Sequence, residues 1–370
     1  MTSAAIVDIE DLLQPISDEN PVGNDIREDS SPSSIYYAIK DSRNSARAAE
    51  RTSMFDGGST EADEHWHKIL DIAPDILTKN TKDLEIACWY TEALLRRYGF
   101  QGLRNGFSLI KQLVERYWDD LYPRPDEDGI ETRVSPLTGL NGEGAEGVLI
   151  APIRNVDITE GDEPGPFSYW KYQQAMDLQK ITDLETREEK IAKAGFGLDN
   201  VESAVSSSSE SFFVNLRDDL IACISSYREI SRLLDGHCGI HEAPPTSNII
   251  NALEDCLSAV KHIGKSKIPV ESEEIIDSHA ESGDNVTSEQ TNTAATTSGP
   301  IKNREHAFKQ LSQISEFFRK TEPHSPISYI LEKAMKWGDM SLSELMQELI
   351  PDSSSRDYYG SLTGIKTDNE

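Results

Sequence analysis

Apolar side chains recur at helical spacing along most of this 370-residue chain, and this periodicity restricts the fold more than any other feature. From Leu84 to Leu95, apolar or small residues follow one another at steps of three and four, which places them on one face of a helix. The same pattern returns over about 103–121, 210–234, 247–263, 307–318 and 327–337. Helices joined by short connections usually pack as antiparallel neighbours. The sequence therefore predicts an all-α fold built from helical bundles.

Proline and glycine indicate where these helices end. Gly99 is placed to stop one helix, and Pro123 terminates the next. Pro74 lies inside an apolar stripe that it is expected to kink or split. The run Val148–Ile158 mixes β-branched residues with Pro152, which favours a short strand or an extended strap.

The segment 271–300 divides the chain, because it has seven acidic residues, no lysine or arginine, and many Ser, Thr and Asn. Such a composition buries too little apolar surface to offset the entropy of ordering, so we expect a disordered acidic linker. We therefore predict a helical N-terminal domain over 1–160, a helical middle region over 161–270, and a small helical C-terminal domain over 301–370.

The net charge of −29, from 65 acidic and 36 basic residues, narrows the class of partner. A chain this acidic repels phosphate backbones and anionic lipid, so we expect neither nucleic-acid binding nor membrane insertion. The four cysteines are too few for a disulfide framework and fit a reducing compartment. With no basic cluster before an early apolar run, and no apolar run near the roughly 20 residues of a spanning helix, we expect a cytoplasmic protein.

Histidine and cysteine offer the main candidates for metal chemistry. His237, Cys238 and His241 are near ligand spacing, and Cys256 or His262 could complete a zinc set, although no C-x-x-C pair is present. A metal-dependent hydrolase is therefore the enzymatic alternative. His65 and His67 are spaced i, i+2 and so point to different sides of a helix, which does not suit a shared metal ion. We expect Trp66, which lies between them, to anchor the core.

Two further patterns lack the context that their chemistry needs. Gly142, Gly144 and Gly147 match the G-x-G-x-x-G of dinucleotide sites, but no strand is predicted before them and an apolar run with a proline follows. The acidic run from Asp126 has no oxygen ligand at the fifth or the twelfth position of a calcium loop. We expect turns at both places, and no catalytic residue, cofactor or metal.

The C-terminal 70 residues carry more apolar side chains than three short helices hide within one copy, which predicts self-association through this domain. A proline-stiffened bend at 321–326 joins two of the helices, and a capping box of Ser341 and Glu344 begins a third that ends at Pro351. The candidate self-association residues are Phe317, Phe318, His324, Ile327, Ile330, Leu331, Trp337, Leu345 and Leu349.

Three stretches of the sequence resemble one protein family. The first contains Pro15-Ile16-Ser17, Asn20-Pro21-Val22-Gly23 and Asp25-Ile26-Arg27. The second begins at Lys82-Asp83-Leu84 and runs through Gly99-Phe100-Gln101-Gly102-Leu103 and Glu115-Arg116-Tyr117-Trp118-Asp119 to Leu121-Tyr122-Pro123. The third is Phe317–Pro326 with Trp337-Gly338. The first two resemble the ImpA N-terminal domain of the TssA family of bacterial type VI secretion, and the third is similar to the C-terminal segment of its short members.

The resemblance implies a function that composition and helical spacing do not reach. It implies a cytoplasmic, non-enzymatic assembly component that acts at the baseplate and tail of a contractile apparatus. It also implies a homo-oligomeric ring formed through the C-terminal part, and contacts with baseplate, sheath or tube components. A generic helical adaptor unrelated to secretion remains a further alternative.

Overall fold

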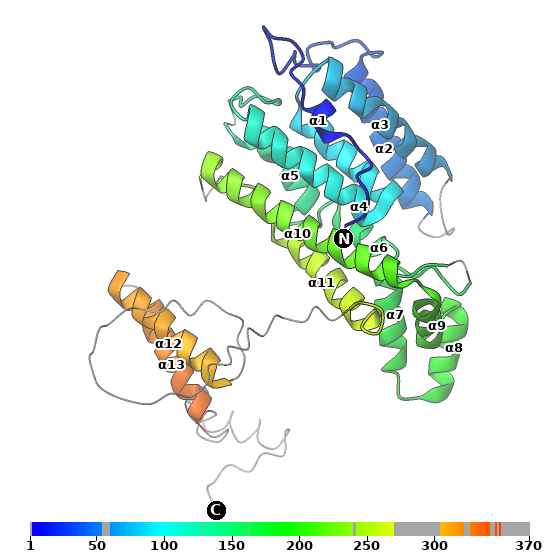
Figure 1. The fold of residues 1–370 in the computed structure, drawn as a ribbon, viewed down its shortest axis with the longest axis vertical. Coiled ribbons are helices and arrows are strands. Elements are labelled where there is room, and N and C mark those ends of the chain that lie inside the picture. The colour runs from blue at the N-terminus through cyan, green and yellow to red at the C-terminus, as the bar shows by residue number, and fades with distance from the viewer. Residues whose placement is uncertain are drawn as a thin grey trace, which may run out of the picture. The chain divides into compact units, whose positions relative to one another are not determined.

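The computed structural model describes residues 2–53, 60–127, 129–161, 163–239, 242–269, 304–321, 326–340, 345 and 348. In chain order its helices are α1 (Ile9–Leu12), α2 (Ile35–Ser53), α3 (Thr60–Lys79), α4 (Leu84–Tyr117), α5 (Glu131–Asn141), α6 (Ile150–Asn155), α7 (Tyr169–Gln179), α8 (Leu184–Ala194), α9 (Leu198–Ser207), α10 (Glu210–Cys238), α11 (Ser247–Ile263), α12 (Arg304–Thr321) and α13 (Ile327–Asp339) (Figure 1). Within the described ranges, β-structure is limited to isolated bridges such as Gly23 with Thr81. The predicted all-α fold is therefore confirmed.

The chain divides into two compact units, Met1–Ile276 and Asp277–Glu370. In the first unit, α4 packs against both α3 and α10, and α2 packs on α3. The helices α7, α8 and α9 lie together at one end of this unit (Figure 1). The middle of the chain thus contributes α10 directly to the core around α4.

Helix α4 changes direction in its middle at a single glycine. Gly99 has φ 58° and ψ −141°, a conformation that residues with a Cβ avoid, while the residues on either side are helical. The predicted stop at Gly99 is thus a sharp kink, after which the helix resumes at once. Both halves are buried, with Leu94 at 1% and Leu103 at 0% exposure.

Two predictions made from proline need comment. The segment Val148–Ile158 is not a strand or strap throughout, because residues Ile150–Asn155 form α6. Pro152 falls in the first turn, where its missing N–H costs no helical hydrogen bond. Only the end of the segment is extended, where Ile158 N donates to Phe167 O at 2.8 Å. Helix α3 also continues through Pro74.

The second unit contains α12 and α13, which pack against each other. Their contact includes a buried hydrogen bond of 3.0 Å from Ser315 Oγ to Ser328 O. Gly338 allows close packing, because a Cβ there would lie 2.1 Å from Phe308 Cζ. The predicted linker, and the Ser341 capping box with most of the third helix, lie outside the described residues.

Within the described part of the chain, no helix combines the length and the apolar character required to cross a bilayer.

Candidate functional site

Residues of the two N-terminal motifs form an ion-pair network that fixes the start of α4. Arg27 Nη1 lies 2.6 Å from Asp83 Oδ2, and Arg27 Nη2 lies 2.6 Å from Glu85 Oε2. Burial alone would lower the pKa of Arg27, and the carboxylates of Asp83 and Glu85 more than offset this, so the pKa is raised. Asp83, which is fully buried, also caps α4 by accepting hydrogen bonds from Glu85 N at 2.9 Å and Ile86 N at 3.1 Å.

Lys82 fixes the neighbouring segments in the same way. Its buried ammonium donates to Leu12 O at 2.7 Å and to Leu77 O at 2.6 Å. Its backbone N donates to Val22 O at 2.7 Å, and its backbone O accepts from Tyr122 N at 3.1 Å. Burial lowers the pKa of Lys82 to about 8. These motif residues therefore connect the N-terminal segment, the end of α3 and the start of α4.

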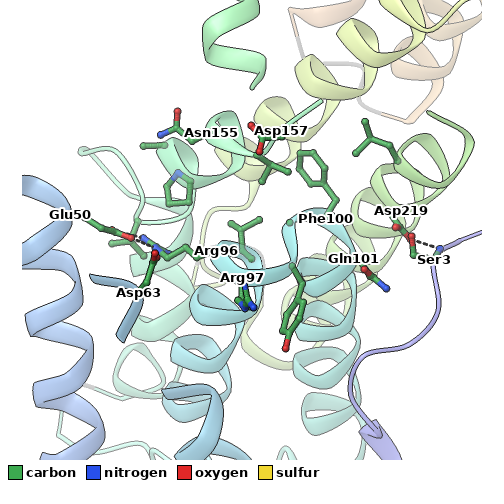
Figure 2. A pocket seen from close by; sticks show the side chains of 18 of the residues that line it. Ser3, Glu50, Asp63, Arg96, Arg97, Phe100, Gln101, Asn155, Asp157 and Asp219 are labelled. Carbon is green, nitrogen blue, oxygen red and sulfur yellow. Dashed lines mark hydrogen bonds and ion pairs between the residues drawn. The ribbon is translucent and has the colours of Figure 1, made fainter. Parts of the chain in front are cut away.

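A groove of about 1010 Å³ lies beside the α4 kink. It is lined by α2, by the first turn of α3, by the kink, by α6 and by the N-terminal half of α10. Figure 2 shows Glu50, Asp63 and Arg96 at one end of the groove and Asp219 with Ser3 at the other. Gly99 itself lies close to another lining residue, since a Cβ at this position would lie 3.0 Å from Val156 Cγ1.

Four groove-lining arginines, Arg47, Arg51, Arg96 and Arg97, form what we call the arginine wall. Arg96 is paired: its Nε lies 2.5 Å from Glu50 Oε1, and its guanidinium lies 4.1 Å from the Trp66 ring centroid. Arg47, Arg51 and Arg97 form no ion pair with any described residue. Excess positive charge therefore collects at one end of the groove in a strongly acidic chain.

The half-buried Arg47 lies among other positive charges of the wall. Burial lowers its pKa, and repulsion from Arg43, Arg51 and Arg96 adds to this effect. Glu92 attracts Arg47, but this fully buried carboxylate is already engaged by Arg43, with 2.7 Å between Arg43 Nε and Glu92 Oε1. A second anion beside Arg47 would relieve the repulsion.

The opposite wall is acidic, but most of its carboxylates are engaged within the chain. Asp219 Oδ1 lies 2.7 Å from Arg104 Nη1. Glu160 Oε2 accepts from both the N and the Oγ of Ser209 at 2.7 Å. Glu146 lies 3.5 Å from Arg154. The lining also includes the apolar residues Val148, Pro152, Val156, Phe212 and Leu216.

The residues proposed for zinc do not come together as a site. No group of three or more His, Cys, Asp or Glu in the described ranges has the arrangement of a metal site. His237 stacks on Trp118 with 4.5 Å between ring centroids. Burial raises the pKa of the Cys256 thiol to about 12, so this thiol stays protonated. His241 lies outside the described residues.

The glycine motif lies in the loop between α5 and α6. Gly142 and Gly144 have positive φ, as tight turns require. A helix rather than a strand comes before the loop, so the dinucleotide arrangement is absent from this part of the structure. Trp66, at 3% exposure, is the core anchor that was expected between His65 and His67.

The candidate self-association residues occupy different environments in the second unit. Phe317 and Ile330 are each 60% exposed and Ile327 is 40% exposed. Phe318, Leu331, Trp337 and Leu345 are half-buried. His324 and Leu349 lie outside the described residues. Tyr329, at 61% exposure, and Ile314, at 45%, are further exposed apolar residues of this unit.

The arginine wall was also missed, although part of its signal is present in the sequence. Arg43, Arg47 and Arg51 recur at steps of four and so share one face of α2. Their proximity to Arg96 depends on the packing of α2 and α3 against α4, which helical spacing alone does not predict.

A charged groove on one helical unit and exposed apolar side chains on another are features that binding and assembly proteins commonly share. Residues 13–142 match the family described as ImpA, N-terminal, type VI secretion system. The curated protein "Type VI secretion system component TssA1" of Pseudomonas aeruginosa is 23% identical over 355 residues, which are 95% of this chain and 97% of that protein.

A solved structure resembles the first unit. It is the N-terminal domain, including the conserved ImpA_N region, of the TssA component of the type VI secretion system from Burkholderia cenocepacia. The likeness has a TM-score of 0.58 at 24% identity and covers 72% of this chain and 98% of that one. These matches confirm the resemblance to the TssA family that the sequence showed.

Proposed function

We propose that this protein is a non-enzymatic structural component of a type VI secretion system that acts at the baseplate and tail of the contractile apparatus. The observation that carries this proposal is the likeness to TssA1 along nearly the whole length of both chains. The site geometry agrees with it, because the most conspicuous charged residues near the N-terminus are engaged in holding the fold. No feature of the described residues favours the hydrolase alternative.

The two units have separate tasks in this proposal. The first unit docks on baseplate, sheath or tube components, and the second forms a homo-oligomeric ring. Exposed apolar side chains on α12 and α13, among them Phe317, Tyr329 and Ile330, support the second task. Side chains of that size at about 60% exposure are stabilised when a second copy covers them. The ring would present several docking units at once.

We place this action in the cytoplasm, without binding to nucleic acid and without insertion in the membrane. The net charge of −29 supports the first exclusion, since it opposes binding to phosphate backbones. All four cysteines are free thiols, which suits a reducing compartment.

The self-association task is tested by light scattering on the full chain. Wild type should be a large oligomer, and the double variant Phe317→Ser/Ile330→Ser should fall to monomer or dimer. Trp170→Ser is the matched control, because Trp170 is 54% exposed on α7 of the first unit. A double variant that keeps the full oligomer size would place the assembly surface elsewhere.

The secretion role is tested in cells. Deletion of the gene should abolish assembly of fluorescent sheath, and the wild-type gene should restore it. Normal sheath assembly in the deletion strain would contradict the proposed function even if the purified protein forms a ring.

A further inference from the structure

The arginine wall carries more positive charge than its own surroundings neutralise. Arg47, Arg51 and Arg97 line the groove without an ion pair in the described ranges, and Asp63 is the exposed carboxylate beside them. Glu50 and Glu92, the other acidic groups at this end, already engage Arg96 and Arg43. Grouped arginines repel one another, and this repulsion is unfavourable. An anionic partner bound at the arginine wall would reduce it.

The shape of the groove restricts the kind of anion. Its volume of about 1010 Å³ lies at the upper end of the usual range for small-molecule pockets. The apolar side chains of Val156, Phe212 and Leu216 also line the groove. A segment of polypeptide with both apolar and acidic side chains fits this lining, whereas a small inorganic anion leaves the apolar surface uncovered.

The charge of the remaining lining excludes a polyanion. Glu146, Asp157 and Asp219 lie along the other side of the groove. A nucleic-acid strand or an anionic membrane would bring phosphates against these carboxylates, in a chain whose net charge is already −29. A peptide instead presents carboxylates at one end only.

We propose that the groove beside the Gly99 kink is a docking site for an acidic, partly apolar segment of a partner protein, whose carboxylates pair with Arg47, Arg51 and Arg97. The apolar side chains of the segment pack between the walls on Val156 and Phe212. This inference adds the chemistry of the partner to the proposed assembly role. It rests on that role in one respect, namely that the partner is a protein.

The test uses the full chain and a fluorescein-labelled peptide with four glutamates at one end and a Leu-Phe pair at the other. Fluorescence anisotropy should show saturable binding that weakens as salt is raised from about 0.05 M to about 0.5 M. The same peptide with glutamine in place of glutamate should bind at least about tenfold more weakly, since charge pairs supply much of such affinity.

Two matched pairs of charge reversals locate the site. Arg51→Glu/Arg97→Glu should weaken binding of the glutamate peptide by about tenfold or more. The control Lys190→Glu/Lys193→Glu makes the same change in net charge on the exposed face of α8, away from the groove lining, and should change binding less than about twofold. The single variant Arg47→Gln removes the charge but keeps a polar side chain at this half-buried position, and it should also weaken binding. Circular dichroism confirms that each variant is folded.

Several results would overturn the proposal. They are no binding of the glutamate peptide, equal losses in the groove and control variants, or binding of the glutamine peptide with the same affinity. If inorganic tripolyphosphate displaces the labelled peptide more effectively than unlabelled peptide does, the arginine wall is instead a phosphate-binding site. None of these results changes the expected outcome of the light-scattering or sheath experiments. Failure of this inference is therefore distinguishable from failure of the proposed function.

Discussion

Asp83 illustrates how one residue of the family motif connects three parts of the chain. Its carboxylate caps α4, pairs with Arg27 from the N-terminal segment, and lies fully buried next to a backbone bridge with Tyr122. A buried carboxylate is tolerated here because each of its oxygens has a partner. The motif at 82–84 is therefore explained by the fold alone.

The substitution Asp83→Ala should destabilise the protein by about 3 kcal/mol, from the lost cap and the broken buried ion pair. Urea unfolding followed by tryptophan fluorescence measures this. Asp75→Ala removes an exposed i, i+4 pair with Lys79 and should cost less than about 1 kcal/mol. A loss at Asp83 no larger than the loss at Asp75 would show that the network contributes little.

Buried thiols should make the protein sensitive to alkali. Burial raises the pKa of Cys88 and Cys223 well above the usual value, and that of Cys256 to about 12. In the unfolded chain these thiols ionise near pH 8.5, so above that pH the unfolded state binds fewer protons and stability falls. Lys82 acts in the opposite direction between about pH 8 and pH 10.5, because burial lowers its pKa.

The net expectation is a loss of about 2–3 kcal/mol per pH unit near pH 9.5, since three thiols oppose one amine. Urea unfolding at about pH 7.5, 8.5 and 9.5 measures how the free energy of unfolding changes with pH. Cys256→Ala should reduce that slope by about one proton, or about 1.4 kcal/mol per pH unit. Identical slopes in the variant and wild type would contradict the assignment to buried thiols.

At the scale of helices, the kink in α4 forms part of the groove lining. The sequence indicated a helix break at Gly99, because glycine commonly ends a helix. It did not indicate that a second helical half follows directly, or that α6 lies opposite the kink. Val148–Ile158 was mistaken for extended chain, since β-branched residues fit a strand pattern and a buried short helix equally well.

Other features of the site could not be predicted for a related reason. Positions 47 and 96 are far apart in sequence, and their side chains approach only after α2, α3 and α4 have packed. Periodicity reports which face of a helix is apolar, and it leaves open which neighbour covers that face. The fold class was therefore predictable from local pattern, whereas the arginine wall was not.

Gly99→Ala should destabilise the protein by about 1–3 kcal/mol, because its φ of 58° and ψ of −141° are unfavourable for any residue with a Cβ. It should also weaken binding of the glutamate peptide, since the new Cβ approaches Val156. The matched control is Gly139→Ala in α5, where a Cβ meets no atom within 4 Å. That change should stabilise by about 0.5–1 kcal/mol. Thermal unfolding measures both, and a neutral Gly99→Ala would refute the role of the kink.

At the scale of the whole molecule, the two proposals combine into a prediction about avidity. A ring that presents many grooves binds a surface carrying many acidic segments more tightly than one groove binds one segment, because each later contact is intramolecular. The exposed side chains of α12 and α13 would thus determine affinity without touching the ligand.

Binding of the glutamate peptide is therefore measured in two formats, free in solution and densely coated on a biosensor surface. Phe317→Ser/Ile330→Ser should leave the solution affinity unchanged and weaken binding to the coated surface by about a hundredfold. Trp170→Ser should alter neither format, and Arg51→Glu/Arg97→Glu should weaken both. Equal surface binding by wild type and the Phe317→Ser/Ile330→Ser variant would mean that self-association does not link the grooves. A loss of solution affinity in that variant would mean that the second unit contributes to the binding site itself.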